Sequence, residues 1–244
     1  MLHQTKGIVL RSVKYGDSGL ICTLFTSLYG VQTYIVQGVR SSKSKNNKAG
    51  LLQPATLLDM VVYHKPNVNM QRIKEYQPAY IYNHMQEDVV KNSIALFSVE
   101  LLLRLLPEHA PFPELFDMAI HYFQQVDMMD NDAVANFPLY FIIQCSRLMG
   151  YEIKGAYTVA TPYLDLQEGG FTNHNPALPP FVQDEDAKAL SGLLRILDLN
   201  KLRDTEMHAA MRYRLLEWFV SFLQRHSQHM GSIKSLQVLQ AILH

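Results

Sequence analysis

The sequence is poor in cysteine and has no long apolar run. Its two cysteines, Cys22 and Cys145, lie in apolar stretches, which favours buried thiols over a disulfide framework. Neither has a second cysteine two to four residues away, which excludes the usual zinc pairs. No run approaches the roughly 18 apolar residues of a membrane span, and the N-terminus lacks a secretory signal pattern. The sequence therefore predicts a cytoplasmic protein.

The motifs of common enzyme classes are also missing. There is no GxxxxGK[ST] loop, no GxGxxG after a strand and no GxSxG. Among the ten histidines, His226 and His229 could share a helix face, but the intervening Ser227 and Gln228 are not ligands, so an exposed helix end is the preferred interpretation. A metal-dependent hydrolase built on dispersed histidines is left as a remote alternative. We expect no enzymatic activity, no metal and no cofactor.

Charge is present but divided unevenly. Residues 1–80 hold ten Lys and Arg against three Asp and Glu, a formal charge of +7, whereas residues 81–244 hold twelve against nineteen, a formal charge of −7. The net charge of zero is thus a cancellation. Such asymmetry suggests an anionic partner for the first segment, and predicts a basic domain at 1–80 followed by an acidic domain at 81–244.

The hydrophobic pattern changes at the same place. Before residue 80, five short β-rich runs alternate with turn residues, which suits a small closed barrel, and the OB-fold is the commonest five-stranded one. The expected strands are Gly7 to Val13, Leu20 to Thr26, Val31 to Gln37, Thr56 to Tyr63 and Met70 to Tyr76.

After Pro78 the apolar period becomes helical. Helices are predicted for a stripe from Ile94 to Leu105, for Pro113 to Met128 and Phe137 to Met149, for a segment capped by Asp184 and extending to Leu197, for a stripe from Leu215 to Leu223, and for a last helix capped by Ser232 or Ser235. Residues 151–183 are predicted to be an irregular, loop-rich subdomain. The expected fold is therefore α+β, with an N-terminal five-stranded OB-fold and a mainly helical second domain.

The stretch "GVRSSKSKNNKAGLLQP" concentrates positive charge between the third and fourth strands. A lysine-rich loop is usually just solvated, but here it joins strands of a predicted barrel that also carries exposed aromatic candidates. Cations that follow phosphates and rings that stack on bases are the usual means of holding single-stranded nucleic acid. The candidate nucleic-acid-binding residues are Arg11, Lys14, Tyr15, Tyr29, Arg40, Lys43, Lys45 and Lys48.

The N-terminal segment "GIVLRSVKYGDSGLICTLFTSLYGVQTYIVQGVRSSKSKNNKAGLLQP" resembles that of the bacterial recombination mediator family RecO. The likeness rests on a GxVLxxxxYxExxxLxxxFT start, a turn glycine, a KGxR-like segment and LQPF. Asp17 replaces the usual Glu, Gln37 the frequent Lys, and Ala55 the frequent Phe. The resemblance is looser in the helical part, at Gly150-Tyr151, at Gly169-Gly170-Phe171 and in "MGSIKSLQVL".

The resemblance implies a non-enzymatic DNA-repair protein of the bacterial cytoplasm, associated with the nucleoid. It would bind single- and double-stranded DNA, anneal complementary strands, and act with RecR to load RecA onto DNA coated by single-strand-binding protein. The acidic, Phe-ended tail of single-strand-binding protein would dock on the helical domain near cations, with Arg104, Arg147, Arg212 and Arg214 as candidates.

The zinc site of many RecO proteins should not be carried over, because its four cysteines are missing from Tyr151 to Thr172. Packing by Tyr157, Tyr163 and Phe171 is expected to hold that subdomain instead. The alternative function is a non-enzymatic adaptor whose basic barrel binds RNA or an acidic protein.

Overall fold

The computed structural model describes residues 1–39, 48–66, 68–203, 205–228 and 230–243. They form two compact units, which we describe separately. The first unit contains Met1–Glu87 and Leu106–Met128, and the second contains Asp88–Leu105 and Met129–His244. The chain thus leaves the first unit after Glu87, returns to it at Leu106 for one helix, and leaves it again after Met128. The domain boundary that charge and hydrophobic pattern place at residue 80 stays a prediction.

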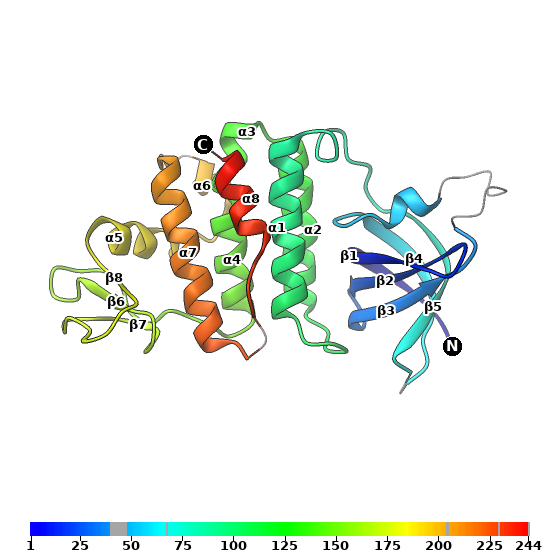
Figure 1. The fold of residues 1–244 in the computed structure, drawn as a ribbon, viewed down its shortest axis with the longest axis horizontal. Coiled ribbons are helices and arrows are strands. Elements are labelled where there is room, and N and C mark those ends of the chain that lie inside the picture. The colour runs from blue at the N-terminus through cyan, green and yellow to red at the C-terminus, as the bar shows by residue number, and fades with distance from the viewer. Residues whose placement is uncertain (40–47, 67, 204, 229, 244) are drawn as a thin grey trace. The chain divides into compact units, whose positions relative to one another are not determined.

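Five strands of the first unit close into a barrel in the order β1-β2-β3-β5-β4 (Figure 1). All neighbouring pairs are antiparallel except β3 and β5, which run parallel. This arrangement is the predicted OB-fold, and the expected α+β fold is confirmed. The strands are β1 (Leu2–Tyr15), β2 (Gly19–Thr26), β3 (Gly30–Val36), β4 (Leu57–Tyr63) and β5 (Met70–Pro78), and a short 3-10 helix, η1 (Lys48–Leu52), precedes β4.

Alternation along the strands separates the barrel interior from its outside. Side chains at every second position, such as Leu20, Cys22 and Leu24 of β2 and Tyr34 and Val36 of β3, lie in one buried cluster. The intervening side chains point outward. Burial raises the pKa of the Cys22 thiol and leaves a free, buried cysteine, as expected.

The first unit also includes helix α2 (Pro113–Met128). Phe25 on the outside of β2 meets Phe116 of this helix edge to face, with ring centroids 5.2 Å apart. The segment before the helix is fastened to the start of β3, where Gly30 has a φ of 65°. A Cβ there would lie 2.0 Å from the carbonyl oxygen of Ala110, so only glycine permits the approach.

The acidic group Asp127 ties the end of α2 to the chain that follows the barrel. Its carboxylate, fully buried, accepts hydrogen bonds from the backbone amides of Asn83, His84 and Met85 and from the Tyr80 hydroxyl. Burial disfavours the charge, but these hydrogen bonds outweigh it and lower the pKa of Asp127. The carboxylate therefore links the end of α2 to residues 80–85 within the first unit by hydrogen bonds, and we call this link the Asp127 clasp.

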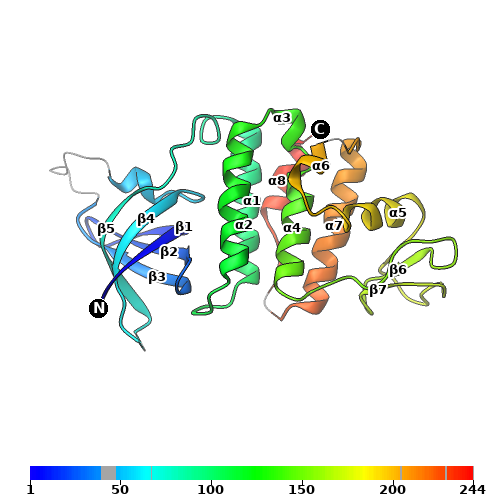
Figure 2. The ribbon, with the colours of Figure 1, turned by 180° about the vertical axis from the view of Figure 1, so that it is seen from behind.

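The second unit is helical. Its elements are α1 (Val89–Leu105), α3 (Asn131–Val134), α4 (Phe137–Leu148), α5 (Asp184–Leu193), α6 (Leu199–Arg203), α7 (Ala209–His226) and α8 (Ser235–Ile242). Helix α4 is buried on nearly all sides because α1, α6 and α7 all pack against it, as Figure 2 shows for α6 and α7. Within the described part of the chain, no helix is both long and apolar enough to cross a membrane.

Two predicted helix starts are wrong. Gln183, in an extended conformation, precedes α5, so Asp184 is its first residue and not its cap, and α5 ends at Leu193, which leaves Leu197 outside it and exposed. Neither Ser232 nor Ser235 caps α8. Instead the Glu100 carboxylate on α1 accepts hydrogen bonds from the Lys234 and Ser235 amides, at 3.0 and 2.8 Å, and from the Ser235 hydroxyl.

The predicted irregular subdomain contains a small sheet, β6 (Tyr163–Asp165), β7 (Gly170–Thr172) and β8 (Phe181–Val182), in the order β7-β6-β8. Its core is aliphatic, with Leu164, Leu166 and Val182 buried. Tyr163 meets Phe181 edge to face, with ring centroids 6.2 Å apart, and Tyr157 and Phe171 are half-buried, so the expectation that Tyr157, Tyr163 and Phe171 hold the subdomain together stays a prediction.

Candidate nucleic-acid interface

Two cross-strand rows of side chains cover the outside of β1, β2, β3 and β5. Residues directly opposite in paired strands point to the same side of a sheet, and these positions alternate with the buried cluster inside the barrel. We call this surface the outer face. The first row is Arg11, Thr23, Thr33 and Met70, and the second is Val13, Ile21, Ile35 and Arg72, with Tyr63 of β4 beside Arg72.

Cations and exposed apolar groups are mixed on the outer face. Arg11 and Arg72 are exposed at its two edges, and no carboxylate in the described part of the chain forms an ion pair with either. Between and beside them, Val13 is 38% exposed, Met70 39% and Tyr63 42%. Unpaired guanidinium groups next to accessible rings and methyl groups suit a ligand with phosphates and flat bases, and this is the face that OB-folds use for oligonucleotides.

Tyr15, which is 49% exposed, extends the outer face at the end of β1, where it lies opposite Gly19. Lys14 belongs to the alternate side, opposite Leu20, and is exposed at that end of the barrel. The structure therefore places Arg11, Lys14 and Tyr15 near one end of β1, with Lys14 on the side opposite to Arg11 and Tyr15.

The lysine-rich stretch leaves and rejoins the barrel at the same end. Val39 and Leu52, on either side of it, both pack into the interior cluster with Leu20, and the Ser12 hydroxyl donates to the Leu52 carbonyl at 2.6 Å. The candidate cations Arg40, Lys43 and Lys45 lie outside the described residues, and Lys48 is described only as the first residue of η1.

Tyr29 lies at the opposite end of the strands, about 20 Å from Tyr15 along β2 by strand rise. Its ring stacks on His64, with centroids 3.9 Å apart and planes 7° from parallel. Burial raises the pKa of the Tyr29 hydroxyl. The two tyrosines proposed as base-stacking residues therefore do not share one surface.

The sequence alone did not single out Arg72, Tyr63 or Met70. Arg72 was counted in the basic excess, but its place depends on the parallel pairing of β3 with β5, two strands that are widely separated in the sequence. The alternation of Met70, Gln71 and Arg72, exposed, buried and exposed, was the only local signal.

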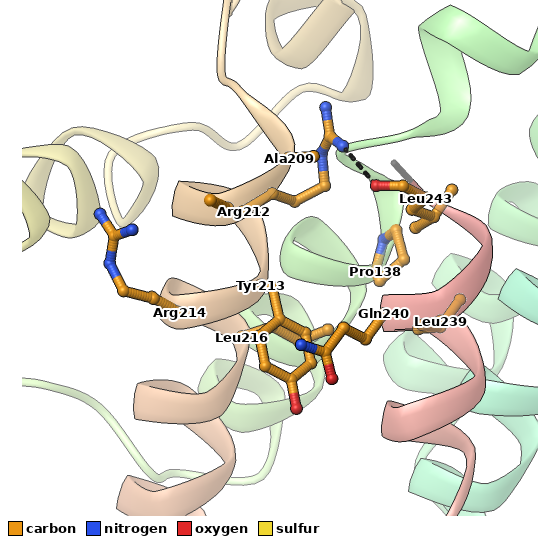
Figure 3. Close-up of a pocket in the computed structure, with 10 residues that line it drawn as sticks. Pro138, Ala209, Arg212, Tyr213, Arg214, Leu216, Leu239, Gln240 and Leu243 are labelled. Atoms are coloured by element: carbon orange, nitrogen blue, oxygen red, sulfur yellow. Dashed lines mark hydrogen bonds between the residues drawn. The ribbon is translucent and has the colours of Figure 1, made fainter.

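The four arginines proposed for partner binding are scattered over the helical unit. Arg147 donates to the Leu194 carbonyl and pairs with Glu152, and Arg104 lies in the last turn of α1, near Glu100. Of the four, Arg212 and Arg214 line the same groove. This groove, about 530 Å³ in volume, lies between α7 and α8 and is floored by apolar residues that include Pro138, Leu216 and Leu239 (Figure 3).

The two groove arginines differ in their charge balance. Arg214 makes a double contact with the Asp186 carboxylate, at 2.8 and 2.9 Å, and Figure 3 shows it extending away from α8. Arg212 is half-buried and donates to Asn136 Oδ1 and to the Met207 and Leu243 carbonyls, which are neutral acceptors. Arg212 therefore keeps a formal positive charge beside the groove.

Comparison with known proteins decides the family. The family models described as Recombination protein O N terminal and Recombination protein O C terminal match residues 1–82 and 86–237. The chain belongs to the RecO family. The DNA repair protein RecO of Bacteroides fragilis is 30% identical over 243 residues and that of Flavobacterium psychrophilum 28% over 246, each match covering 99% of both chains. That of Phocaeicola vulgatus is 30% identical over 243 residues, with the same coverage.

The RecO resemblance drawn from sequence is thus confirmed, together with DNA repair as the broad role of the family. No group of three possible metal-ligating side chains occurs among the described residues. His226 donates through Nε2 to the Leu166 carbonyl, 2.9 Å away, and packs on Phe222, while His229 lies outside the described residues.

Proposed function

We propose that this RecO-family chain binds single- and double-stranded DNA on the outer face of its barrel and acts without catalysis of its own. The observation that carries the proposal is the pair of cross-strand rows, with Val13, Met70 and Tyr63 exposed on or beside them. Arg11 and Arg72, at the edges, form no ion pair with any described residue. The unpaired cations would contact phosphates, and the exposed rings and methyl groups would pack on bases.

The charge distribution supports the proposal that DNA binds to the barrel of the first unit and not to the helical unit. The basic excess lies in residues 1–80, with a formal charge of +7, whereas residues 81–244 carry a formal charge of −7. Even within the first unit, Leu106–Met128 carries four acidic residues and no Lys or Arg. Like-charge repulsion would keep the DNA backbone away from these acidic parts.

For the helical unit, we propose that the α7–α8 groove takes the acidic, Phe-ended tail of single-strand-binding protein. Its apolar floor would receive the aromatic ring, and Arg212, which has no carboxylate partner in the described chain, would attract the tail carboxylates. With RecR, the protein would then load RecA onto coated DNA and anneal coated strands, in the bacterial cytoplasm at the nucleoid.

A strand-annealing assay tests the DNA part of this proposal. Complementary oligonucleotides coated by single-strand-binding protein are mixed with the native protein or with an Arg11→Gln/Arg72→Gln variant. We expect the native protein to speed annealing and the variant to do so several-fold less. No acceleration by the native protein would contradict the proposal, and preferential competition by RNA over DNA would favour the adaptor alternative.

The groove is tested with a labelled peptide that copies an acidic, Phe-ended tail. Gln240, exposed on α8, lines the groove, so Gln240→Glu adds a negative charge where the tail would lie and should weaken peptide binding several-fold. Gln228→Glu, at an exposed position outside the groove, is the matched control. Equal binding by both variants would place the tail elsewhere.

A further inference from the structure

A polar hollow lies at the end of the barrel remote from Tyr15, among the β2–β3 turn, the β4–β5 loop and the segment before α2. We call it the β4–β5 hollow. Its volume is about 450 Å³, a size suited to a small-molecule group. The residues that matter for its chemistry are Tyr29, Gln32, His64, Lys65 and His109.

The loop that forms one wall is held in place by a buried amide. Gln71, 3% exposed, accepts a hydrogen bond from the Lys65 amide at 3.0 Å through Oε1. Its Nε2 donates to the carbonyls of Lys65 and Val68, both at 2.8 Å. The side-chain amide of Gln71 thus holds the backbone of Lys65 and Val68 in place without a ligand.

The opposite wall is fixed in a similar way. The His109 amide donates to the Val31 carbonyl at 3.1 Å. Gln32, 2% exposed, donates through Nε2 to the Tyr29 carbonyl at 3.0 Å and lies 2.7 Å from His109 Nδ1. Both hydrogens of Nε2 are therefore engaged, which leaves Gln32 Oε1 as a pure acceptor.

Aromatic rings form the third side. His64 stacks on Tyr29, and the His3 ring meets Tyr29 edge to face at 5.8 Å. Burial lowers the pKa of His64, and so do the neighbouring His3, the N-terminal amine and His109. His64 is therefore a neutral, flat ring at pH 7, with Lys65 exposed next to it as a cation.

Two polar atoms of the hollow are buried without a partner in the described chain, namely Gln32 Oε1 and His64 Nδ1. Buried polar atoms are normally paired, so these two point to a missing ligand. Inorganic phosphate would not match Gln32 Oε1, which is itself an acceptor, and would leave the rings unused. A nucleobase carries N–H donors for Oε1 and a face for the rings, and the phosphate attached to it would suit Lys65.

We propose that the β4–β5 hollow receives one nucleotide of a single DNA strand, with its base against His64 and Gln32 and its phosphate at Lys65. This inference rests on the proposed DNA-binding function and adds to it a second contact point, at the other end of the barrel from Tyr15. The strand would then run along the outer face from the β1–β2 turn to the β4–β5 loop.

The test is an NMR titration of the full chain that follows the histidine rings and glutamine side-chain amides. Three probes are added separately: thymidine monophosphate, thymidine and inorganic phosphate. We expect the monophosphate to shift the Gln32 and His64 signals at lower concentration than either part alone. His64→Ala should abolish the shift of the Gln32 side-chain amide, whereas His121→Ala, at an exposed position on α2, should not.

Single-strand affinity supplies the second readout. His64→Ala removes the ring that would stack on one base, so it should weaken binding of a labelled oligonucleotide about fivefold or more, with His121→Ala unchanged. If His64→Ala does not fold, Lys65→Gln serves instead and should remove the advantage of the monophosphate over thymidine.

The outcomes separate this inference from the function beneath it. Equal shifts with inorganic phosphate would overturn it in favour of a simple anion site. An oligonucleotide that binds the protein while the monophosphate leaves Gln32 and His64 unmoved would overturn the hollow and leave the proposed function standing. An oligonucleotide that does not bind at all would overturn both.

Discussion

Replacing Arg11 and Arg72 by Gln should flatten the salt dependence of single-strand binding. Both guanidinium groups are exposed at the edges of the outer face and have no ion pair in the described chain. Each phosphate that a cation neutralises on a single strand contributes a slope of about 0.7 in the logarithm of affinity against the logarithm of salt concentration. Removing both cations should therefore reduce the slope by about 1.4.

The magnitude has a direct consequence for affinity. Salt concentrations of 50 and 200 mM differ by about 0.6 logarithmic units. With a slope difference of about 1.4, the ratio of native to variant affinity should therefore be about sevenfold smaller at 200 mM than at 50 mM. Fluorescence anisotropy of a labelled oligonucleotide, measured at four or more salt concentrations in that range, detects such a change.

The control removes the same number of charges from the other unit. Arg195→Gln/Arg225→Gln replaces two arginines that are exposed on the helical unit and should leave the slope unchanged. If the outer-face variant and the control have the native slope, Arg11 and Arg72 do not contact phosphates and the reasoning from the cross-strand rows is refuted.

Three further predictions concern other parts of the chain. Lys43→Ala/Lys45→Ala/Lys48→Ala should flatten the same slope by up to about 0.7 for each phosphate that these lysines neutralise, and a native slope would leave the stretch a solvated loop. Glu100→Gln should cost about 1 kcal/mol of unfolding free energy by weakening the α8 cap. Burial disfavours the charge of Glu100, but the hydrogen bonds from Ser235 and Lys234 outweigh it and lower the pKa of Glu100 in the folded state. The stabilisation by this cap should therefore be present above the pKa of Glu100 in the unfolded chain, and should vanish as pH falls through its pKa in the folded state. A Glu100→Gln variant that loses as much stability in acid as the native protein would contradict this. Asp127→Asn should cost about 2 to 3 kcal/mol, measured by urea unfolding, and a loss of stability below about 0.5 kcal/mol would argue against the clasp.

The strands could be predicted because their local pattern agrees with their burial. Leu58, Met60 and Val62 alternate with more exposed neighbours in β4, as a strand with one buried face requires. The helices α2 and α4 were predicted closely because α2 begins at Pro113, and because α4 ends just before Gly150 with Arg147 in its last turn. Each of these signals lies within a short segment of the chain, so the sequence alone is enough to read it.

Features that depend on distant partners could not be predicted. The α8 start lacks a capping serine because its cap is Glu100, 135 residues away in sequence from Ser235. The outer face depends on the pairing of β3 with β5, and Arg72 acquires its neighbours only through that register. Helix α2 (Pro113–Met128) has an apolar helical pattern like that of the other helices, yet it groups with the barrel unit, because Phe116 packs on Phe25 of β2.

Photo-crosslinking of the full chain to a single-stranded oligonucleotide that carries 5-iodouracil tests the central claim most directly. The account predicts crosslinks to Tyr15, Tyr63 or Met70, which are exposed on or beside the outer face, when the crosslinked peptides are identified by mass spectrometry. Crosslinks confined to aromatic residues of 129–244 would contradict it, because the DNA would then lie on the helical unit and not on the barrel.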